Sequence, residues 1–139
     1  MRQFLLVVFL VSMLVPVFSV AQEIEKNSMP QKVFAIPKEN IRPLVTNMGG
    51  AFATDRIMVQ GKKIGYMYCE VASRPEDSGW RFFAGDEEQS YIDDLSHTGV
   101  YSVNTISNYD ADIIPYLSTP APCAFEKIPG SNRYRLVEE

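Results

Sequence analysis

Two stretches rich in β-branched and aromatic residues lie on either side of a short polar connection. They span residues 52–59 and 63–71, and Gly61 stands in the middle of the connection. Ile57 and Val59 alternate with polar neighbours, which is the period of a half-buried strand. A glycine in a short connection between two such runs favours a hairpin. The pattern therefore predicts that the two runs pair as neighbouring strands.

Five further segments complete the predicted core. Residues 79–83 and 100–103 have the composition of short strands, and residues 110–117 have that of a short helix. Residues 123–128 and 134–137 flank a turn-forming Pro-Gly-Ser-Asn sequence, which predicts a terminal hairpin. The expected fold class is α+β, with a small, mostly antiparallel sheet and one or two short helices.

The start of the chain has the pattern of an export signal. Arg2 precedes an apolar run over residues 4–18, and small residues occupy the first and third positions of Ser19-Val20-Ala21. We therefore expect residues 1–21 to be a cleavable signal peptide. The alternative is a retained membrane anchor, because the run is at the short edge of a spanning helix. Membrane contact is expected only through this segment, if it is retained.

The rest of the chain divides into two parts by composition. Residues 22–48 are polar, contain Pro30 and Pro37 and show no clean period, so we expect an N-terminal arm or linker. Residues 49–139 are expected to form a single α+β domain, and the chain is long enough to bury a core.

The charge balance narrows the class of partner. The chain has 13 basic and 17 acidic side chains, a net charge of −4, and removal of the segment with Arg2 makes it −5. A negative domain binds nucleic acid poorly, because phosphate contacts need Lys and Arg. The same charge suits a partner with a basic surface.

The two cysteines, Cys69 and Cys123, leave two interpretations open. Outside the cytoplasm an even number of cysteines favours a disulfide, and closing a loop of this length would stabilise the fold by about 4 kcal/mol. The alternative is two separate buried thiols. A metal site is not expected, because the cysteines and the single histidine, His97, lack ligand spacing.

No enzyme motif is present in the sequence. Neither a nucleophile elbow nor a phosphate-binding loop can be assigned, and no cofactor is expected. His97 is more typical of a solvated polar loop than of a general base, because a base needs a nucleophile and an orienting group. A run of carboxylates precedes it, formed by Asp86, Glu87, Glu88, Asp93 and Asp94.

This acidic run has several interpretations. A calcium loop does not fit, because the spacing misses the EF-hand pattern. An acid pair of the kind that cleaves glycosides, a solvated acidic edge and a patch that meets a basic partner all stay open. Aromatic residues could add anchors to such a patch, and for Trp80 and Phe82 a place in the core is favoured over a place at an interface. The other two candidate anchors are Tyr91 and Tyr101.

Five motifs carry a resemblance to a known family. They are Asp55-Arg56-Ile57, the segments 61–68, 77–87 and 99–106, and Asn108-Tyr109-Asp110. Over residues 52–126 the chain resembles the bacterial family known as immunity protein thirty-three. The motif residues carried over are Asp77, Ser78, Gly79, Trp80, Arg81, Phe82, Gly85, Asn104 and Tyr109.

The resemblance implies a non-catalytic protein that neutralises a toxin used between competing bacteria. Together with the leader it implies a periplasmic or secreted immunity protein that binds a toxin with a basic surface. The expected contact residues are Asp86, Glu87, Glu88, Tyr91, Asp93 and Asp94. Two alternatives stay open: a small envelope enzyme that uses Asp86, Glu87 and His97, and an accessory envelope protein with another ligand.

Overall fold

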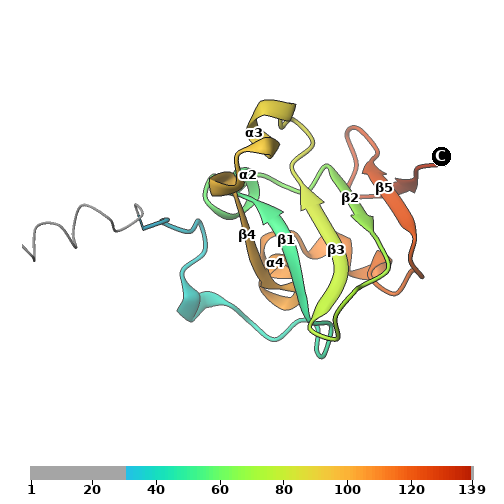
Figure 1. Ribbon diagram of the computed structural model, residues 1–139, viewed down its shortest axis with the longest axis horizontal. Helices are drawn as coiled ribbons and strands as arrows, with labels where there is room; N and C mark the ends of the chain where they lie inside the picture. Colours follow the sequence, from blue (N-terminus) through green and yellow to red (C-terminus); the bar gives the residue numbers. More distant parts are fainter. Residues whose placement is uncertain (1–30, 139) are drawn as a thin grey trace, which may run out of the picture. The chain divides into compact units, whose positions relative to one another are not determined.

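The computed structural model describes residues 31–138, which contain one six-stranded sheet (Figure 1). The strand order is β4-β1-β3-β2-β5-β6, and only β1 and β3 are parallel neighbours. The α+β class and the mostly antiparallel sheet are thus confirmed. The strands are β1 (Gly50–Thr54), β2 (Tyr66–Cys69), β3 (Asp77–Phe83), β4 (Thr98–Ser102), β5 (Cys123–Lys127) and β6 (Tyr134–Leu136).

The predicted export segment, residues 1–21, lies outside the described residues. Over residues 31–138 there is no helix with the length and apolar character needed to cross a membrane.

The hairpin predicted for residues 52–59 and 63–71 is wrong. The chain leaves β1 at Thr54 and forms the short helix α2 (Asp55–Met58), so β1 and β2 do not pair. Gly61 has φ +72° and donates its N–H to the Ile57 carbonyl at 3.0 Å, so it closes a helix rather than a hairpin turn. In the sheet, β3 lies between β1 and β2.

The later elements follow the predictions more closely. The strand predictions at 79–83 and 100–103 correspond to β3 and to most of β4. The terminal hairpin is confirmed by the pairing of β5 with β6. The short helix predicted over 110–117 is the 3-10 helix η3 (Ala111–Tyr116), which Asp110 caps by accepting the Asp112 N–H.

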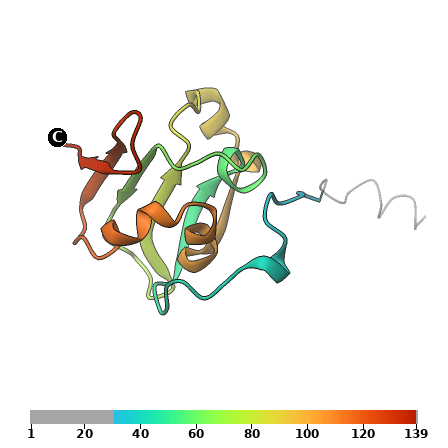
Figure 2. The ribbon, with the colours of Figure 1, turned by 180° about the vertical axis from the view of Figure 1, so that it is seen from behind.

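One face of the sheet is covered by α4 (Val103–Tyr109) and η3, which Figure 2 shows in front of the strands. Trp80 and Phe82 of β3 point to this face with 2% and 0% of their surface exposed. Ile106 and Ile113 from the helices are also fully buried. Burial of such side chains contributes about 1.5–3 kcal/mol each. Trp80 and Phe82 are therefore core residues, as the sequence favoured.

The segment that precedes β1 contacts the domain through hydrogen bonds from its backbone N–H groups to side chains of α4. It contains the 3-10 helix η1 (Lys38–Asn40). Asn104 Oδ1 accepts the Leu44 and Val45 N–H groups at 2.7 and 3.0 Å. The Tyr109 hydroxyl accepts the Ile36 N–H at 3.1 Å. The family-motif residues Asn104 and Tyr109 thus have a structural role, because they fix this segment against α4.

Candidate functional site

The sheet face opposite the helices carries a row of side chains that crosses five strands. Side chains alternate along a strand, so the residues between the buried ones point to this second face, which Figure 1 shows from the front. The strand registers align, in order, Val100 of β4, Phe52 of β1, Arg81 of β3, Tyr68 of β2 and Ala124 of β5. Phe52 is 42% exposed and Val100 is 66% exposed, whereas Arg81 at the centre of the row is buried, with 8% of its surface exposed.

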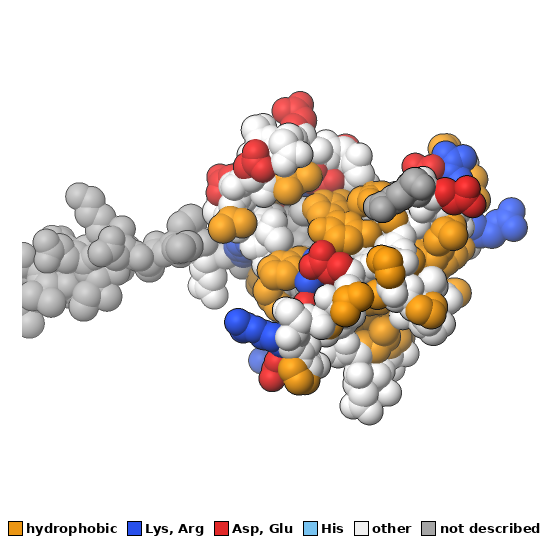
Figure 3. All heavy atoms as spheres, turned by 45° about the vertical axis from the view of Figure 1, so that its right-hand side comes forward, with side chains coloured by type: hydrophobic (Ala, Val, Ile, Leu, Met, Phe, Trp, Pro, Cys, Tyr) orange, Lys and Arg blue, Asp and Glu red, His pale blue; other side chains and the backbone are white. Residues whose placement is uncertain are grey.

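A second row extends the aromatic surface. Phe83 of β3 aligns with Tyr66 of β2, and their ring centroids are 6.0 Å apart. Phe83 also stacks with Tyr68, at 5.9 Å between centroids and 12° between ring planes. We name Phe52, Tyr66, Tyr68 and Phe83, with Arg81 among them, the aromatic face. Figure 3 shows a broad hydrophobic area on this side, with acidic and basic atoms at its middle.

A β-bulge at the start of β3 sets the position of Arg81. Gly50 pairs with Asp77 and Phe52 pairs with Arg81, so two steps along β1 correspond to four along β3. Gly79 has φ +85° within the bulge and donates its N–H to Asp77 Oδ1 at 2.9 Å. Bulges of this kind change the direction of a side chain. The bulge brings the Asp77 carboxylate back beside the guanidinium of Arg81.

Ser78 supports the same bulge from within the motif. Its hydroxyl donates to the Gly50 carbonyl at 2.6 Å and accepts the Trp80 N–H at 3.1 Å. The Asp77-Ser78-Gly79 part of the motif therefore fixes the backbone conformation that places Asp77 beside Arg81.

Two carboxylates surround the single cation of the aromatic face. Arg81 donates from Nη1 and Nη2 to the two oxygens of Asp77, both at 2.8 Å, and from Nη2 to Glu70 Oε1 at 3.0 Å. Its guanidinium also lies 4.7 Å from the ring centroid of Phe52. The hydrogen bond from Arg81 lowers the pKa of Asp77 to about 2. With both carboxylates ionised, the three groups carry one net negative charge.

The predicted acidic binding segment has mostly internal partners. Asp86 forms ion pairs with Lys62 and with Arg56 Nε, the latter at 3.8 Å. Hydrogen bonding from Lys62 lowers the pKa of Asp86. Glu87 accepts the Thr54 hydroxyl at 2.6 Å and the Ala84 and Gly85 N–H groups at 2.7 and 2.8 Å. Both carboxylates therefore hold the loop together.

The remainder of the segment forms α3 (Gln89–Asp93) and η2 (Leu95–His97). Asp94 accepts the Ser96 N–H and caps η2, and hydrogen bonds from Ser96 lower its pKa. Asp93 accepts a hydrogen bond from Gln89 at 2.8 Å. Glu88 is exposed at the start of α3. Glu88 and Asp93 are thus the carboxylates of this segment most open to a partner.

Tyr91 and His97 face each other rather than a shared cleft. Their rings stack with centroids 4.0 Å apart, and His97 Nδ1 lies 3.1 Å from the Tyr91 carbonyl oxygen. The Arg56 guanidinium lies over the Tyr91 ring, 4.9 Å from the ring centroid. The nearest carboxylate partner of His97 is Asp94, at 3.8 Å. The enzyme alternative requires His97 to act together with Asp86 and Glu87. Within residues 31–138 no hydrogen bond or ion pair joins His97 to either carboxylate.

The two remaining candidates lie at different places: Gly85 lines a shallow pocket with Tyr66, Tyr68 and Phe83 at the edge of the aromatic face, whereas Tyr101 does not line it. Tyr101, a candidate anchor, packs edge-on against Phe34, with ring centroids 5.7 Å apart. Gly85 lies at the turn that follows β3, with φ +99°.

The two cysteines lie directly opposite each other. Cys69 of β2 aligns with Cys123 of β5, and both are free thiols in the structure. Burial raises the pKa of both thiols. Over residues 31–138 no group of three or more His, Cys, Asp or Glu side chains is arranged to hold a metal ion.

The sequence motif identifies Arg81 as a site residue, but it does not identify its neighbours Glu70, Tyr68 and Phe83 as such. The usable signal was the position of Arg81 in a strand, between Trp80 and Phe82. When the two aromatic neighbours are buried, alternation places the arginine on the opposite face. Its partners depend on the sheet order and could not be derived from the strand alone.

Comparison with known proteins assigns the family. Residues 51–137, more than half of the chain, match the family model described as the Immunity protein Imm33 domain. Searches of curated proteins and of solved structures found no match. The resemblance seen in the sequence motifs is thus confirmed by a match that includes most of β1, all of β3 and the aromatic face. The chain belongs to the Imm33 immunity protein family.

Proposed function

We propose that this protein neutralises a bacterial toxin by direct contact, without catalysis, and that the aromatic face is its contact surface. The observation that carries this proposal is the row of side chains from Val100 to Ala124, which is exposed at Phe52 and Val100 and has a buried arginine at its centre. Membership of an immunity family supports a toxin as the partner.

The chemistry of the aromatic face resembles that of protein interfaces. Tyrosine and arginine are enriched among the residues that dominate binding energy, particularly where neighbouring side chains exclude water. Tyr68 has this setting, because Phe83 stacks on one side and Arg81 aligns with it on β3. The Tyr68 hydroxyl is protonated at neutral pH, as an ordinary tyrosine is, and can donate a hydrogen bond; burial raises its pKa further.

The acidic segment would then assist encounter rather than form the contact. Asp86 and Glu87 are engaged within the fold, whereas Glu88 and Asp93 remain exposed. Exposed charges of this kind speed the approach of an oppositely charged partner. A net charge of −4 suits a toxin with a basic surface.

Tyr68→Ala is expected to weaken toxin binding about 30-fold, because loss of a central interface tyrosine costs about 2 kcal/mol. The measurement requires a toxin gene beside this one: titration calorimetry with its toxin domain gives the affinity, and survival of cells that express the domain gives the protection. Tyr91→Ala is the matched control, since it removes the same side chain from the acidic segment, and it should change the affinity less than about threefold.

The opposite ranking would place the interface on the acidic segment. In that case Tyr91→Ala and Glu88→Lys would weaken binding while Tyr68→Ala would not. Absence of a toxin gene beside this one, and of any binding, would favour an accessory envelope protein that uses the same face for another ligand.

We further propose that the protein works in the periplasm or after secretion and that Cys69 and Cys123 form a disulfide there. Directly opposed residues of antiparallel strands have Cα atoms about 4.5–5.5 Å apart, within the range that a disulfide spans. The two thiols would exchange with the disulfide of an oxidised dithiol protein. One S–S bond forms between the cysteines, and the donor leaves as a dithiol.

Intact mass and thiol alkylation of the protein from the extracytoplasmic fraction test this proposal. The expected product begins at Gln22, lacks two hydrogens relative to the reduced chain and reacts with iodoacetamide only after reduction. Cys123→Ser, the control, should leave one thiol that no longer pairs within the chain. A cytoplasmic product that retains Met1 would contradict the proposal on location, and two alkylatable thiols in an exported product would contradict the disulfide.

A further inference from the structure

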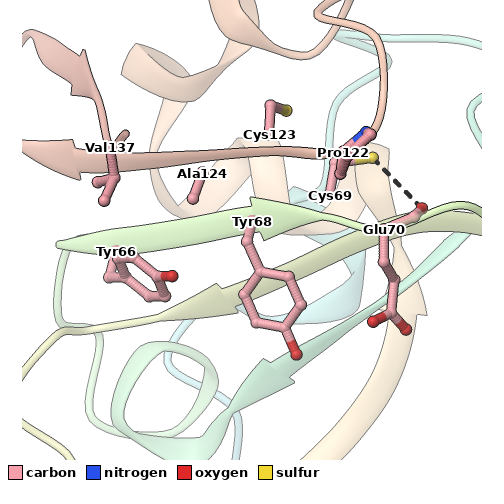
Figure 4. Close-up of a pocket in the computed structure, with 8 residues that line it drawn as sticks. All are labelled: Tyr66, Tyr68, Cys69, Glu70, Pro122, Cys123, Ala124 and Val137. Carbon is pink, nitrogen blue, oxygen red and sulfur yellow. Dashed lines mark hydrogen bonds between the residues drawn. The ribbon is translucent and has the colours of Figure 1, made fainter. Parts of the chain in front are cut away.

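A groove of about 530 Å³ lies on the aromatic face between β2 and the chain segment around β5. Its walls include the rings of Tyr66 and Tyr68, and Ala124 and Val137 line it from the side of β5 (Figure 4). Ala124 aligns with Tyr68 across the strands, and its small side chain leaves the space beside the larger rings open. Glu70 also lines the groove, and its carboxylate extends on the same side of β2 as the two tyrosine rings.

The groove has an acidic group with unused capacity. Glu70 is engaged through Oε1 with Arg81, and its side chain is still 55% exposed. The positive charge of Arg81 is already balanced by Asp77, which accepts hydrogen bonds from both terminal nitrogens of the guanidinium. The charge of Glu70 is therefore in excess of what Arg81 balances, and among residues 31–138 no hydrogen bond to Oε2 competes with a further donor.

The walls of the groove can accommodate the flat part of a cation. The rings of Tyr66 and Tyr68 line the groove, and the face of an aromatic ring attracts a cation. A guanidinium is planar, stacks on aromatic rings and presents several donors to a carboxylate, whereas an ammonium is a compact and strongly hydrated charge. An arginine side chain thus matches the groove in shape, apolar contact and charge.

We infer that this groove receives an arginine side chain of the toxin, with its stem between the tyrosines and Ala124 and its guanidinium on Glu70. This inference rests on the proposed function and specifies its partner chemistry. It also explains how an aromatic contact face could select a basic toxin. The arginine of the toxin would bind within the aromatic face and not only at its edge.

The probe is a short peptide, acetyl-Gly-Arg-Gly-amide, titrated into the isotopically labelled protein while amide chemical shifts are followed. We expect saturable shifts at Tyr68, Glu70 and Ala124. The same peptide with citrulline, which keeps the shape of arginine but not its charge, should bind at least about fivefold more weakly. The lysine peptide should also bind more weakly than the arginine peptide.

Two variants locate the binding to this groove. Glu70→Gln should weaken the arginine peptide about fivefold, and Ala124→Leu should abolish its binding by filling the groove without removing a charge. Glu39→Gln is the control that removes an exposed carboxylate elsewhere, on η1, and it should leave the affinity unchanged. Unperturbed spectra away from the groove show that each variant is folded.

Three results would overturn the inference: no saturable shift at the groove, equal affinity for arginine and citrulline peptides, or equal affinity for the lysine peptide. Because the titration uses no toxin, its failure is separate from failure of the proposed function. If the protein does not bind the peptide but Tyr68→Ala still weakens toxin binding, the aromatic face remains the proposed interface. Only the inference that the groove receives an arginine is then rejected.

Discussion

Gly79→Ala is expected to lower the free energy of unfolding by about 3 kcal/mol or more. A Cβ at this position would lie 2.1 Å from the Glu70 backbone oxygen and 3.2 Å from Cys69 Sγ. The oxygen belongs to the residue that directly follows β2, and the N–H of the same residue donates to the Gly79 carbonyl at 3.0 Å, so it cannot move aside without disturbing the contact between the two chain segments. The φ of +85° adds the cost that any residue with a side chain meets in the left-handed region.

Gly130→Ala is the matched control, because this glycine also has a left-handed conformation, with φ +71°, but no atom lies within 4 Å of the added Cβ. Its expected cost is about 1–2 kcal/mol, from the backbone conformation alone. Urea unfolding curves of the two variants measure the difference. Equal destabilisation would mean that the contact with Glu70 contributes nothing and that the strands adjust around the methyl group.

The loss at Gly79 should also change the site. The bulge that contains Gly79 returns the Asp77 carboxylate to Arg81, so a shift in its backbone moves both partners. We expect the variant to bind toxin more weakly than its folded fraction accounts for, whereas Gly130→Ala should bind like the original protein.

Trp80→Ala is expected to cost about 3–5 kcal/mol of stability, the range for large aromatic side chains deleted from a core. Trp80 is 2% exposed and stacks with Phe82, with ring centroids 5.9 Å apart, and with Phe125 at 6.4 Å. Its removal leaves a cavity beneath the helices that the surrounding strands cannot fill. Thermal and urea unfolding both measure the loss.

Phe52→Ala is the control on the other side of the same sheet. Phe52 is 42% exposed, so its removal should cost less than about 1.5 kcal/mol of stability while weakening toxin binding. Trp80→Phe should retain toxin binding under conditions in which it is folded. If Trp80→Phe lost binding while fully folded, Trp80 would act as an interface anchor and not only as a core residue.

The fold class can be predicted from the sequence because most strands carry local signals. The terminal hairpin is determined by its turn residues together with the apolar runs of β5 and β6, all close in the chain. The family motifs likewise needed no structure, because a match depends on residue identity and order. The acidic charge also follows from the sequence alone, and from it a poor affinity for nucleic acid is predicted.

The predicted hairpin failed because its pairing partner was not local. Residues 55–58 form a helix, and β1 finds its parallel partner in β3, beyond the whole of β2. Hydrophobic alternation cannot distinguish these outcomes, since it reports that a segment is half buried and not what lies beside it.

The candidate site shows the same limit more clearly. Alternation in β3 separates Trp80 and Phe82 from Arg81 and Phe83, but either face could have been the covered one. The position of α4 and η3 decided it, and that packing also left the aromatic face open. The residues themselves determined strands with two chemically different faces. Only the tertiary structure decided which face met the helices and which strands brought Glu70, Asp77 and Phe52 to the same arginine, because sheet order joins residues far apart in the chain.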